Sequence, residues 1–359
     1  MPTSHSLARP GAFCFLILAA FVASCGDSAG SGQGADAPWP LTEFPPLPDV
    51  MKNVPDARIE LGHLLFYDAV LSVDQQTSCS TCHSERWGLS DTLRQGVGHG
   101  AGLLAGPGRK GPNTLRRNSS TLYNLAFRET LTWNGGAETL EEQVLIPLFD
   151  ADEMSADPDR VVSDLLAIPE YVDMFAEAFP DNPVVSIDNL ASALAAYQRT
   201  FLSVDAPYDK HAAGRSRVLT EDMTEGMFRF AEMGCHDCHT PPLFESETFA
   251  NRSVQKVEGI VDDGREEITE RPEDRGKFRT VTLRNIAFTE PYFHNGTVNA
   301  LDDAVRHELE QGAQPFTDED VRLITVFIGT ALRDRSNDAV RPASLPSGLP
   351  LSLDDPGSR

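Results

Sequence analysis

Positive charge is scarce in this chain. Its 359 residues include 30 lysines and arginines against 54 aspartates and glutamates, for a formal net charge of −24. Nucleic acids and anionic lipid surfaces are bound through clusters of positive charge, so this composition argues against both as partners. An acidic surface serves solubility, and it also permits electrostatic attraction of a basic partner protein.

Long hydrophobic runs are missing beyond the first 24 residues. The apolar run Ala12–Val22 is too short for a comfortable membrane span but has the length of a signal-peptide core. It leads into Val22–Cys25, which resembles the lipobox of bacterial lipoproteins and implies cleavage before Cys25 and a lipid on its sulfur. Ordinary cleavage nearby, with Cys25 as an unmodified thiol, is the alternative. Either route predicts a periplasmic or other extracytoplasmic protein, and the lipobox adds a membrane anchor through Cys25.

Cysteine is also rare, and four of the six cysteines form two short motifs. Cys79–His83 and Cys235–His239 both read Cys-x-x-Cys-His. This pattern is typical of c-type haem attachment, in which two thiols bind the vinyl groups of one porphyrin and the imidazole becomes the proximal iron ligand. A single copy would also suit half of a zinc site or a redox dithiol, but two copies that both end in histidine favour haem. With Cys14 removed and Cys25 lipidated, no pair is left for a structural disulfide. The predicted haem-binding residues are Cys79, Cys82 and His83 for one haem c and Cys235, Cys238 and His239 for the other.

Apolar residues recur at helical spacing along the rest of the chain, and no convincing series of strands is present. The clearest helical stretches are Ala57–Ala69, Ser186–Ser203, Thr220–Ala231 and Thr317–Arg333. We therefore expect a mainly α fold with two cytochrome-c-like helical domains, each wrapped around one covalently bound haem, and with long loops. The expected parts are a signal peptide over residues 1–24, a flexible linker over 25–48, haem domains over 49–205 and 206–340, and a tail over 341–359 that is extended or disordered.

Further short motifs follow one another in a fixed order. They are Leu61–Asp68, the first haem motif, Arg117–Thr121, Trp133–Gly136, Leu140–Gln143, Glu153–Met154, Ala178–Pro180, the second haem motif, Leu283–Ile286 and Pro291–Gly296. With these motifs the chain resembles the bacterial dihaem cytochrome c peroxidase superfamily, which includes the MauG-type protein-oxidising enzymes, over about residues 55–335. The resemblance implies that the His83 haem, in the peroxidatic domain, reacts with hydrogen peroxide. It also implies that the His239 haem, in the electron-transfer domain, receives electrons.

The resemblance implies roles for single residues as well. Trp133 matches the tryptophan that lies between the two haems and helps to pass electrons; packing between domains is its alternative role. Gln143 and Glu153 match the pocket glutamine and the catalytic glutamate. A carboxylate beside a haem can take a proton from one peroxide oxygen and deliver it to the other. Without the resemblance, Glu153 would be one solvated acid in an acidic loop.

Two further matches concern metal coordination. Asn118, Thr289 and Pro291 match positions that hold an interdomain calcium ion in the family, and oxygen ligands suit calcium. His99 matches the histidine that caps the peroxidatic iron at rest in many peroxidases of the family, whereas MauG-type enzymes generally lack it. Surrounding glycines would let this loop move. The alternative for His99 is an ordinary solvated loop histidine.

The chain departs from the family at the distal side of the second haem. Peroxidases of the family have a methionine there and MauG-type enzymes a tyrosine, about fourteen residues after the histidine that corresponds to His294. Counting forward reaches Glu308; no methionine follows the second haem motif, and Tyr292 is the only tyrosine that does. His307 is the best nitrogen donor available, so we expect it as the distal ligand, with a plain helix-face histidine as the alternative. Loss of the methionine predicts a lower haem potential.

Three functions are compatible with these features. The first is a peroxidase that reduces hydrogen peroxide with electrons from a small periplasmic cytochrome or copper protein, entering at the His239 haem and passing through Trp133 to the His83 haem. The second is a MauG-like oxidase that acts on a partner protein; the missing methionine favours it, while His99 and the missing tyrosine do not. The third is a dihaem electron-transfer protein without catalysis, which Gln143 and Glu153 disfavour. The sequence leaves a homodimer open.

Overall fold

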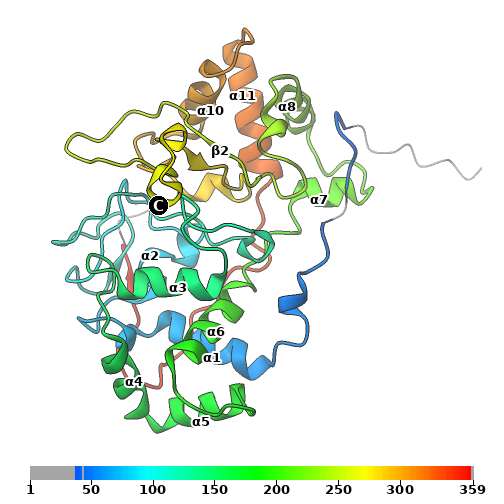
Figure 1. Ribbon diagram of the computed structural model, residues 1–359. Helices are drawn as coiled ribbons and strands as arrows, with labels where there is room; N and C mark the ends of the chain where they lie inside the picture. The colour runs from blue at the N-terminus through cyan, green and yellow to red at the C-terminus, as the bar shows by residue number, and fades with distance from the viewer. Residues whose placement is uncertain (1–36, 43, 357–359) are drawn as a thin grey trace, which may run out of the picture. The chain divides into compact units, whose positions relative to one another are not determined.

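The computed structural model describes residues 37–42 and 44–356, so the predicted signal peptide and Cys25 lie outside the described residues. Helices and long loops dominate, which confirms the mainly α fold expected from the sequence (Figure 1). Within the described ranges, no helix has both the length and the apolar character needed to cross a bilayer.

The helices of the N-terminal half pack around α1. These helices are α1 (Asp56–Tyr67), α2 (Cys79–Cys82), α3 (Leu140–Phe149), α4 (Pro158–Leu166), α5 (Pro169–Ala178) and α6 (Ile187–Gln198). Helix α1 contacts α5 and α6, and α3 also packs on α6. A Cβ at Gly62 of α1 would lie 1.9 Å from the carbonyl oxygen of Ala193 in α6. Only glycine therefore lets these two helices cross so closely.

The C-terminal half also has a glycine where two helices cross closely. Its helices are α7 (Pro207–Ala212), α8 (Glu221–Glu232), α9 (Glu266–Thr269), α10 (Leu301–Glu310) and α11 (Asp318–Val326), which continues as a π-helical turn over Phe327–Ala331. Helix α8 packs against α11, and a Cβ at Gly226 would lie 2.1 Å from the carbonyl oxygen of Leu323. Thr220 caps α8 by accepting a hydrogen bond from the backbone N–H of Met223.

Extended structure is limited to two small sheets in the described part of the chain. The strands are β1 (Leu104–Ala105), β2 (Phe249–Ala250), β3 (Phe278–Arg279) and β4 (Leu353–Asp354). Strand β1 pairs parallel with β4, and β2 pairs antiparallel with β3. Short 3₁₀ turns cover Asp49–Met51, Ala69–Leu71, Glu85–Trp87, Leu125–Phe127, Cys235–Asp237, Pro272–Asp274 and Ile286–Phe288.

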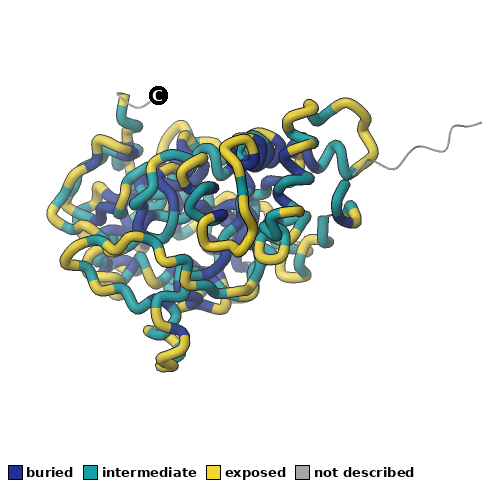
Figure 2. The backbone as a smooth tube through the Cα atoms, turned by 90° about the horizontal axis from the view of Figure 1, so that it is seen from above, coloured by how far each residue is buried: buried dark blue, intermediate teal, exposed yellow. Residues whose placement is uncertain are grey.

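Buried side chains form two main hydrophobic clusters. Figure 2 marks the buried stretches of the backbone in dark blue and the exposed stretches in yellow. One cluster draws on α1 and α3–α6, together with Leu345 from the tail. The other draws on α7, α8, α10 and α11, together with Trp39, whose indole N–H donates to the hydroxyl of Tyr208 at 2.9 Å. The described residues, 37–42 and 44–356, nevertheless belong to one compact unit, and the domain boundaries at 205/206 and 340/341 stay a prediction.

Helix positions agree with the expected stretches, with differences at the ends. The helix expected over Ser186–Ser203 ends at Gln198, and the one expected over Thr317–Arg333 is α11 plus the π-helical turn. The chain at the predicted domain boundary, residues 205–208, runs directly into α7 because Pro207 occupies the first turn of that helix.

The C-terminal tail is extended and packs beside the first haem motif. Arg341 pairs with Glu85 at 2.5 Å and with Asp354 at 2.6 Å. The hydroxyl of Ser352 lies 3.2 Å from that of Ser80 in α2. Of the two alternatives expected for the tail, the described residues therefore take the packed, extended one.

An internal repeat relates the loops that follow the two haem motifs. Asn124 and Asn285 both have left-handed backbones, with φ of 60° and 59°, and both side chains are buried. Each amide exchanges two hydrogen bonds with a distant backbone, that of Ser203 or Asp334. Helices α3 and α10 then begin sixteen residues after their asparagine and have ten residues each. The two helices therefore occupy equivalent positions in the two halves.

Candidate active site

The first haem motif presents two thiols and one imidazole with a defined orientation. Cys79 and Cys82 are free cysteines at the two ends of α2, and His83 follows directly. The Nδ1 atom of His83 lies 2.9 Å from the carbonyl oxygen of Leu89, which accepts its proton and leaves Nε2 with a lone pair for a metal. Burial lowers the pKa of His83, so the ring stays neutral, as a metal ligand must.

The second motif repeats this arrangement. Cys235 and Cys238 are free, and Nδ1 of His239 lies 3.2 Å from the carbonyl oxygen of Phe244. Burial also lowers the pKa of His239. Both histidines therefore have the backbone hydrogen bond that orients an iron-ligating imidazole.

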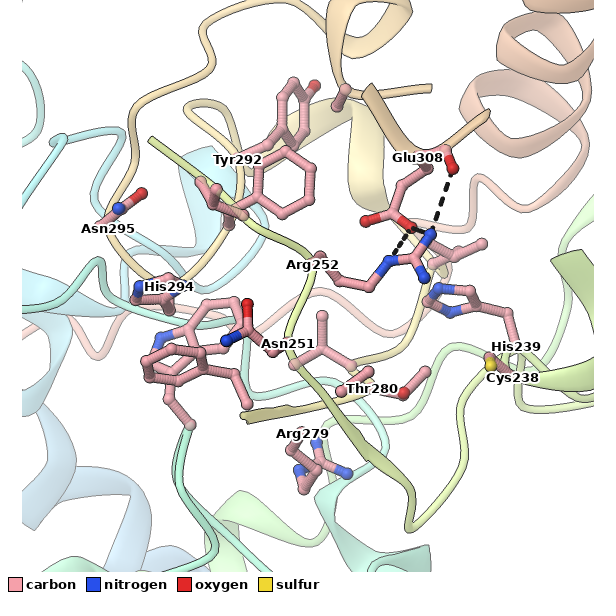
Figure 3. A pocket seen from close by; sticks show the side chains of 18 of the residues that line it. Cys238, His239, Asn251, Arg252, Arg279, Thr280, Tyr292, His294, Asn295 and Glu308 are labelled. Atoms are coloured by element: carbon pink, nitrogen blue, oxygen red, sulfur yellow. Dashed lines mark hydrogen bonds and ion pairs between the residues drawn. The ribbon is translucent and has the colours of Figure 1, made fainter. Parts of the chain in front are cut away.

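A large cavity opens beside the second motif (Figure 3). Its volume is about 1380 Å³, and Cys235, Cys238 and His239 form part of its wall. Sites for cofactor-sized ligands usually enclose roughly 300–1,000 Å³. The cavity is thus large enough for a porphyrin next to the residues that would attach it.

The same cavity contains a buried arginine whose guanidinium lacks a hydrogen bond at two of its nitrogens. Arg279 is 3% exposed, and its Nε and Nη1 have no hydrogen-bond partner among the described residues. The nearby carboxylate of Glu247 lies 4.0 Å from Nη1, too far for a hydrogen bond. Burial lowers the pKa of Arg279 to about 9. A buried guanidinium with unsatisfied N–H groups is costly, and the propionate carboxylates of a haem would supply the missing hydrogen-bond acceptors. The residues present therefore fit the cofactor.

Replacing Arg279 by glutamine tests this fit. We expect the midpoint potential of the His239 haem to fall, because a nearby positive charge stabilises the reduced iron relative to the oxidised iron. The measurement is a spectroelectrochemical titration of the haem-loaded protein. Arg275→Gln is the matched control, since Arg275 lines the same cavity but already pairs with Glu266 at 2.5 Å. An equal shift in both variants would contradict the assignment.

The pocket beside the first motif is small. Its volume is about 50 Å³, and it is lined by Cys79, Cys82, His83 and, among others, Gln143 and Glu153. This volume is below the usual range for cofactor sites. The argument that the first motif binds a haem therefore depends on its two thiols and its oriented imidazole, not on the volume of the pocket. The structure does bring Gln143 and Glu153 to the first motif, as the sequence predicted.

The polar groups of this pocket are poised for proton transfer. Burial raises the pKa of Glu153 to about 7, and the neighbouring carboxylates of Asp150 and Asp152 add to the effect. The Oε1 atom of Gln143 is buried and has no hydrogen-bond partner in the described part of the chain. A carboxyl group that titrates near neutral pH can both accept and donate a proton.

His99 lies next to the Glu153 loop but outside the pocket lining. Its backbone N–H donates to the carbonyl oxygen of Glu153 at 2.7 Å, and its Nε2 lies 3.1 Å from the carbonyl oxygen of Ala151. A Cβ at Gly98 would lie 1.8 Å from the carbonyl oxygen of Asp152. The His99 loop is therefore packed directly on the loop that positions Glu153, and its ring is not directed to the first motif. Ligation of iron by His99 stays a prediction.

Trp133 lies in the wall of the second cavity. Its indole N–H donates to the carbonyl oxygen of Asn118 at 2.8 Å, and its backbone carbonyl accepts from the N–H of Arg279 at 2.9 Å. Its ring lies edge-on to His294, with centroids 6.5 Å apart. Trp133 and His294 are equivalent positions of the internal repeat, nine residues after Asn124 and Asn285.

The predicted calcium residues Asn118, Thr289 and Pro291 all line the second cavity. The Asn118 amide donates to the carbonyl oxygen of Leu93, and the Thr289 hydroxyl donates to that of Ile286. In residues 37–42 and 44–356, no cluster of three or more histidine, cysteine or acidic side chains suits a metal ion. Calcium binding therefore stays a prediction.

The geometry does not bring His307 to the cavity. Its Nε2 lies 2.8 Å from the carbonyl oxygen of Arg252, and its side chain is not part of the cavity lining, whereas Glu308 is. Residues three and four apart share a helix face, so Glu308 lies with Ala304 and Val305 on the face toward the cavity while His307 points elsewhere. The rotation of α10 about its axis decides whether His307 or Glu308 faces the cavity, and the residue types do not reveal this rotation.

Two attachment motifs, each with an oriented and neutral histidine, and a mainly helical fold define a dihaem c-type protein. A family model described as "Di-haem cytochrome c peroxidase" matches residues 56–217. The chain is 36% identical over 273 residues to cytochrome c551 peroxidase of Pseudomonas aeruginosa, covering 73% of this chain and 76% of that protein. It is 31% identical over 256 residues to the methylamine utilization protein MauG of Methylorubrum extorquens, covering 71% and 69%.

A solved structure supports the same family assignment. The crystal structure of a MauG-like protein associated with microbial copper homeostasis superimposes with a TM-score of 0.72 at 27% identity, covering 85% of this chain and 97% of that one. The chain belongs to the di-haem cytochrome c peroxidase family, which includes MauG. It is therefore a peroxidase-type oxidoreductase, and the family implies two haem c groups.

Proposed function

We propose that the protein is an extracytoplasmic dihaem peroxidase that reduces hydrogen peroxide to water at the His83 haem. The observation that carries this assignment is the asymmetry of the two sites. The first pocket contains Gln143 and Glu153, whereas the equivalent positions of the internal repeat hold Ala304 and Gln314. Only the first site thus combines a partly buried acid with an amide at these positions.

The residues of the first pocket have separate tasks. When bound, haem supplies the iron that binds peroxide and changes oxidation state. The two cysteines fix the porphyrin, and the hydrogen bond to Leu89 orients His83. Glu153 accepts a proton from one peroxide oxygen and returns it to the other, as its pKa near 7 allows. The unpaired amide of Gln143 orients the bound peroxide.

Electrons would enter at the His239 haem from a small periplasmic redox protein and reach the His83 haem through Trp133. The position of Trp133 in the wall of the second cavity supports this route. An acidic chain with a net charge of −24 would attract a basic donor. The lipid anchor at Cys25 and a calcium ion near Asn118, Thr289 and Pro291 belong to the same proposal.

A second candidate is a MauG-like oxidase that removes electrons from a partner protein. The identity of Glu308 favours it, because the cavity of the second motif offers no methionine at the position where peroxidases of the family have one. The structural likeness to a MauG-like protein points in the same direction.

Peroxide added at each stage of a reductive titration distinguishes these functions. For the peroxidase we expect reaction with peroxide only after one electron has reduced the His239 haem, because this reduction would release the capping His99 from the first site. A stable two-electron-oxidised protein formed without prior reduction would instead support the MauG-like oxidase. Absence of any reaction at either stage would contradict both. Optical spectra of the protein with two haems attached provide the measurement.

A further inference from the structure

The cavity-facing side of α10 identifies what lies opposite His239. In the first half, the equivalent helix α3 turns Gln143, Val144 and Pro147 toward the pocket of the first haem motif. In the second half, α10 turns Ala304, Val305 and Glu308 toward the cavity of the second motif. The two sets correspond one to one in the internal repeat, since Pro147 and Glu308 each lie 23 residues after the left-handed asparagine of their half. Glu308 therefore takes the place of Pro147, and a carboxylate replaces an apolar ring.

Glu308 and Arg252 line the same cavity as the attachment residues Cys235 and His239. In Figure 3 the side chains of Glu308, Arg252 and His239 appear in the same part of the cavity. Glu308 is therefore the cavity-lining carboxylate that the internal repeat places on α10 in this half of the chain.

Arg252 holds the carboxylate through one of its two oxygens. Its Nε donates to Oε2 of Glu308 at 2.7 Å, and its Nη2 lies 2.6 Å from the same atom. Nη2 also donates to the backbone carbonyl of Glu308 at 3.1 Å. The Oε1 atom is not engaged by Arg252. His307 hydrogen-bonds to the backbone carbonyl of Arg252, so the neighbouring histidine also helps to hold Arg252 in place.

We propose that Glu308 is the distal ligand of the His239 haem, coordinating through Oε1 while Arg252 holds Oε2. The site then takes a ferric iron with an anionic oxygen donor, where relatives use sulfur or phenolate. Arg252 is a positioning residue, and His307 is not a ligand. The proposal rests on the proposed function only in that the second motif carries haem c; it does not depend on which substrate the His83 haem oxidises.

The test compares four variants of the haem-loaded protein: Glu308→Met, Glu308→Gln, His307→Gln and Arg252→Lys. Haem content is measured first, so that a failure of attachment is separated from a change of ligand. Electron paramagnetic resonance and optical spectra then report the spin state of the ferric His239 haem, and a redox titration reports its midpoint potential. Peroxide turnover is recorded separately, which keeps the outcome independent of the peroxidase assignment.

A carboxylate is a weak-field donor, so we expect a high-spin ferric signal from the second haem of the unmodified protein. Glu308→Met should convert this haem to a low-spin species and shift its potential upward, because thioether ligation favours the reduced iron. Glu308→Gln should also shift the potential upward, since the anionic donor is lost, and His307→Gln should leave spin state and potential unchanged. Arg252→Lys keeps the charge but loses the paired contact, so the optical spectrum of this haem should broaden or shift. A low-spin unmodified protein that becomes high-spin in His307→Gln, with Glu308→Gln unchanged, would overturn the proposal.

Discussion

Replacing Glu153 by glutamine is expected to lower the rate of peroxide turnover by about 10²–10⁴-fold, the usual contribution of a general acid–base group. The substitution keeps the size and one hydrogen-bonding oxygen but removes the titrating proton. Both haems should stay attached, because Glu153 lines the first pocket without belonging to the attachment motif. Steady-state turnover with a reduced electron donor, normalised to haem content, measures the effect. Unchanged turnover would remove Glu153 from the mechanism.

Asp152→Asn is the matched control. Asp152 is an exposed acid in the same loop, and it acts on Glu153 only by raising its pKa. We expect little change in turnover for this variant and a small displacement of the pH profile to lower pH. A loss as large as that of Glu153→Gln would show that loop charge, not a specific proton carrier, sustains the reaction.

The pH dependence follows from the raised pKa of Glu153. The pKa is about 7, above the value for an exposed glutamate, so the group is protonated below that pH and gains its base form above it. Turnover should therefore rise as the pH passes through about 7, and the residual activity of Glu153→Gln should lack this step.

The free energy of unfolding should fall over the same pH range in which turnover rises. Burial favours the protonated form of Glu153 in the folded state, so its contribution to stability is lost as the pH rises through 7. Chemical denaturation of the two proteins from pH 5 to 8 checks the second expectation.

Replacing Arg284 by methionine is expected to lower the free energy of unfolding by about 3–5 kcal/mol, the usual cost of removing one partner of a buried ion pair. Arg284 is fully buried, and its Nη1 and Nη2 donate to the two carboxylate oxygens of Asp209 at 2.8 and 2.6 Å. It also donates to the carbonyl oxygens of Ser203 and Pro242. The variant removes both arginine contacts of the Asp209 carboxylate and the arginine donor of the Pro242 carbonyl, and it loosens the loop that follows the second haem motif. Guanidinium denaturation of the haem-loaded protein gives the value.

A surface arginine provides the comparison. Arg322 also pairs with two carboxylates, those of Asp222 and Glu319, but all three side chains are largely exposed. Arg322→Met should therefore leave the midpoint of unfolding almost unchanged. If both variants lose the same stability, burial of the Arg284 network does not explain its contribution.

Several helices escape recognition from sequence alone for identifiable reasons. Pro147 lies inside α3 and reads as a helix breaker, although the helix tolerates it near its C-terminal end. Helices α4 and α5 have proline in the first turn, at Pro158 and Pro169, which indicates a helix start only when the flanking pattern is read with it. The four expected helical stretches, in contrast, show regular apolar spacing and lie within a few residues of their predicted ends.

The sequence by itself determined the chemistry that is local in the chain. Attachment of a haem needs two thiols and an imidazole within five residues, and such a motif is readable wherever the chain folds. The resemblance carried by the order of the motifs assigned Gln143 and Glu153 to the first haem, and both residues line the pocket of the first motif.

Only the tertiary structure decided which side chains face the second haem. Whether His307 or Glu308 points into the cavity depends on the rotation of α10 about its axis, and one residue of difference turns a side chain by about a third of a turn. That Arg279 is buried in the same cavity with two nitrogens free of hydrogen bonds depends on segments far apart in sequence packing around it. Spacing along a chain records neither rotation nor long-range packing, because both are set by the whole buried core.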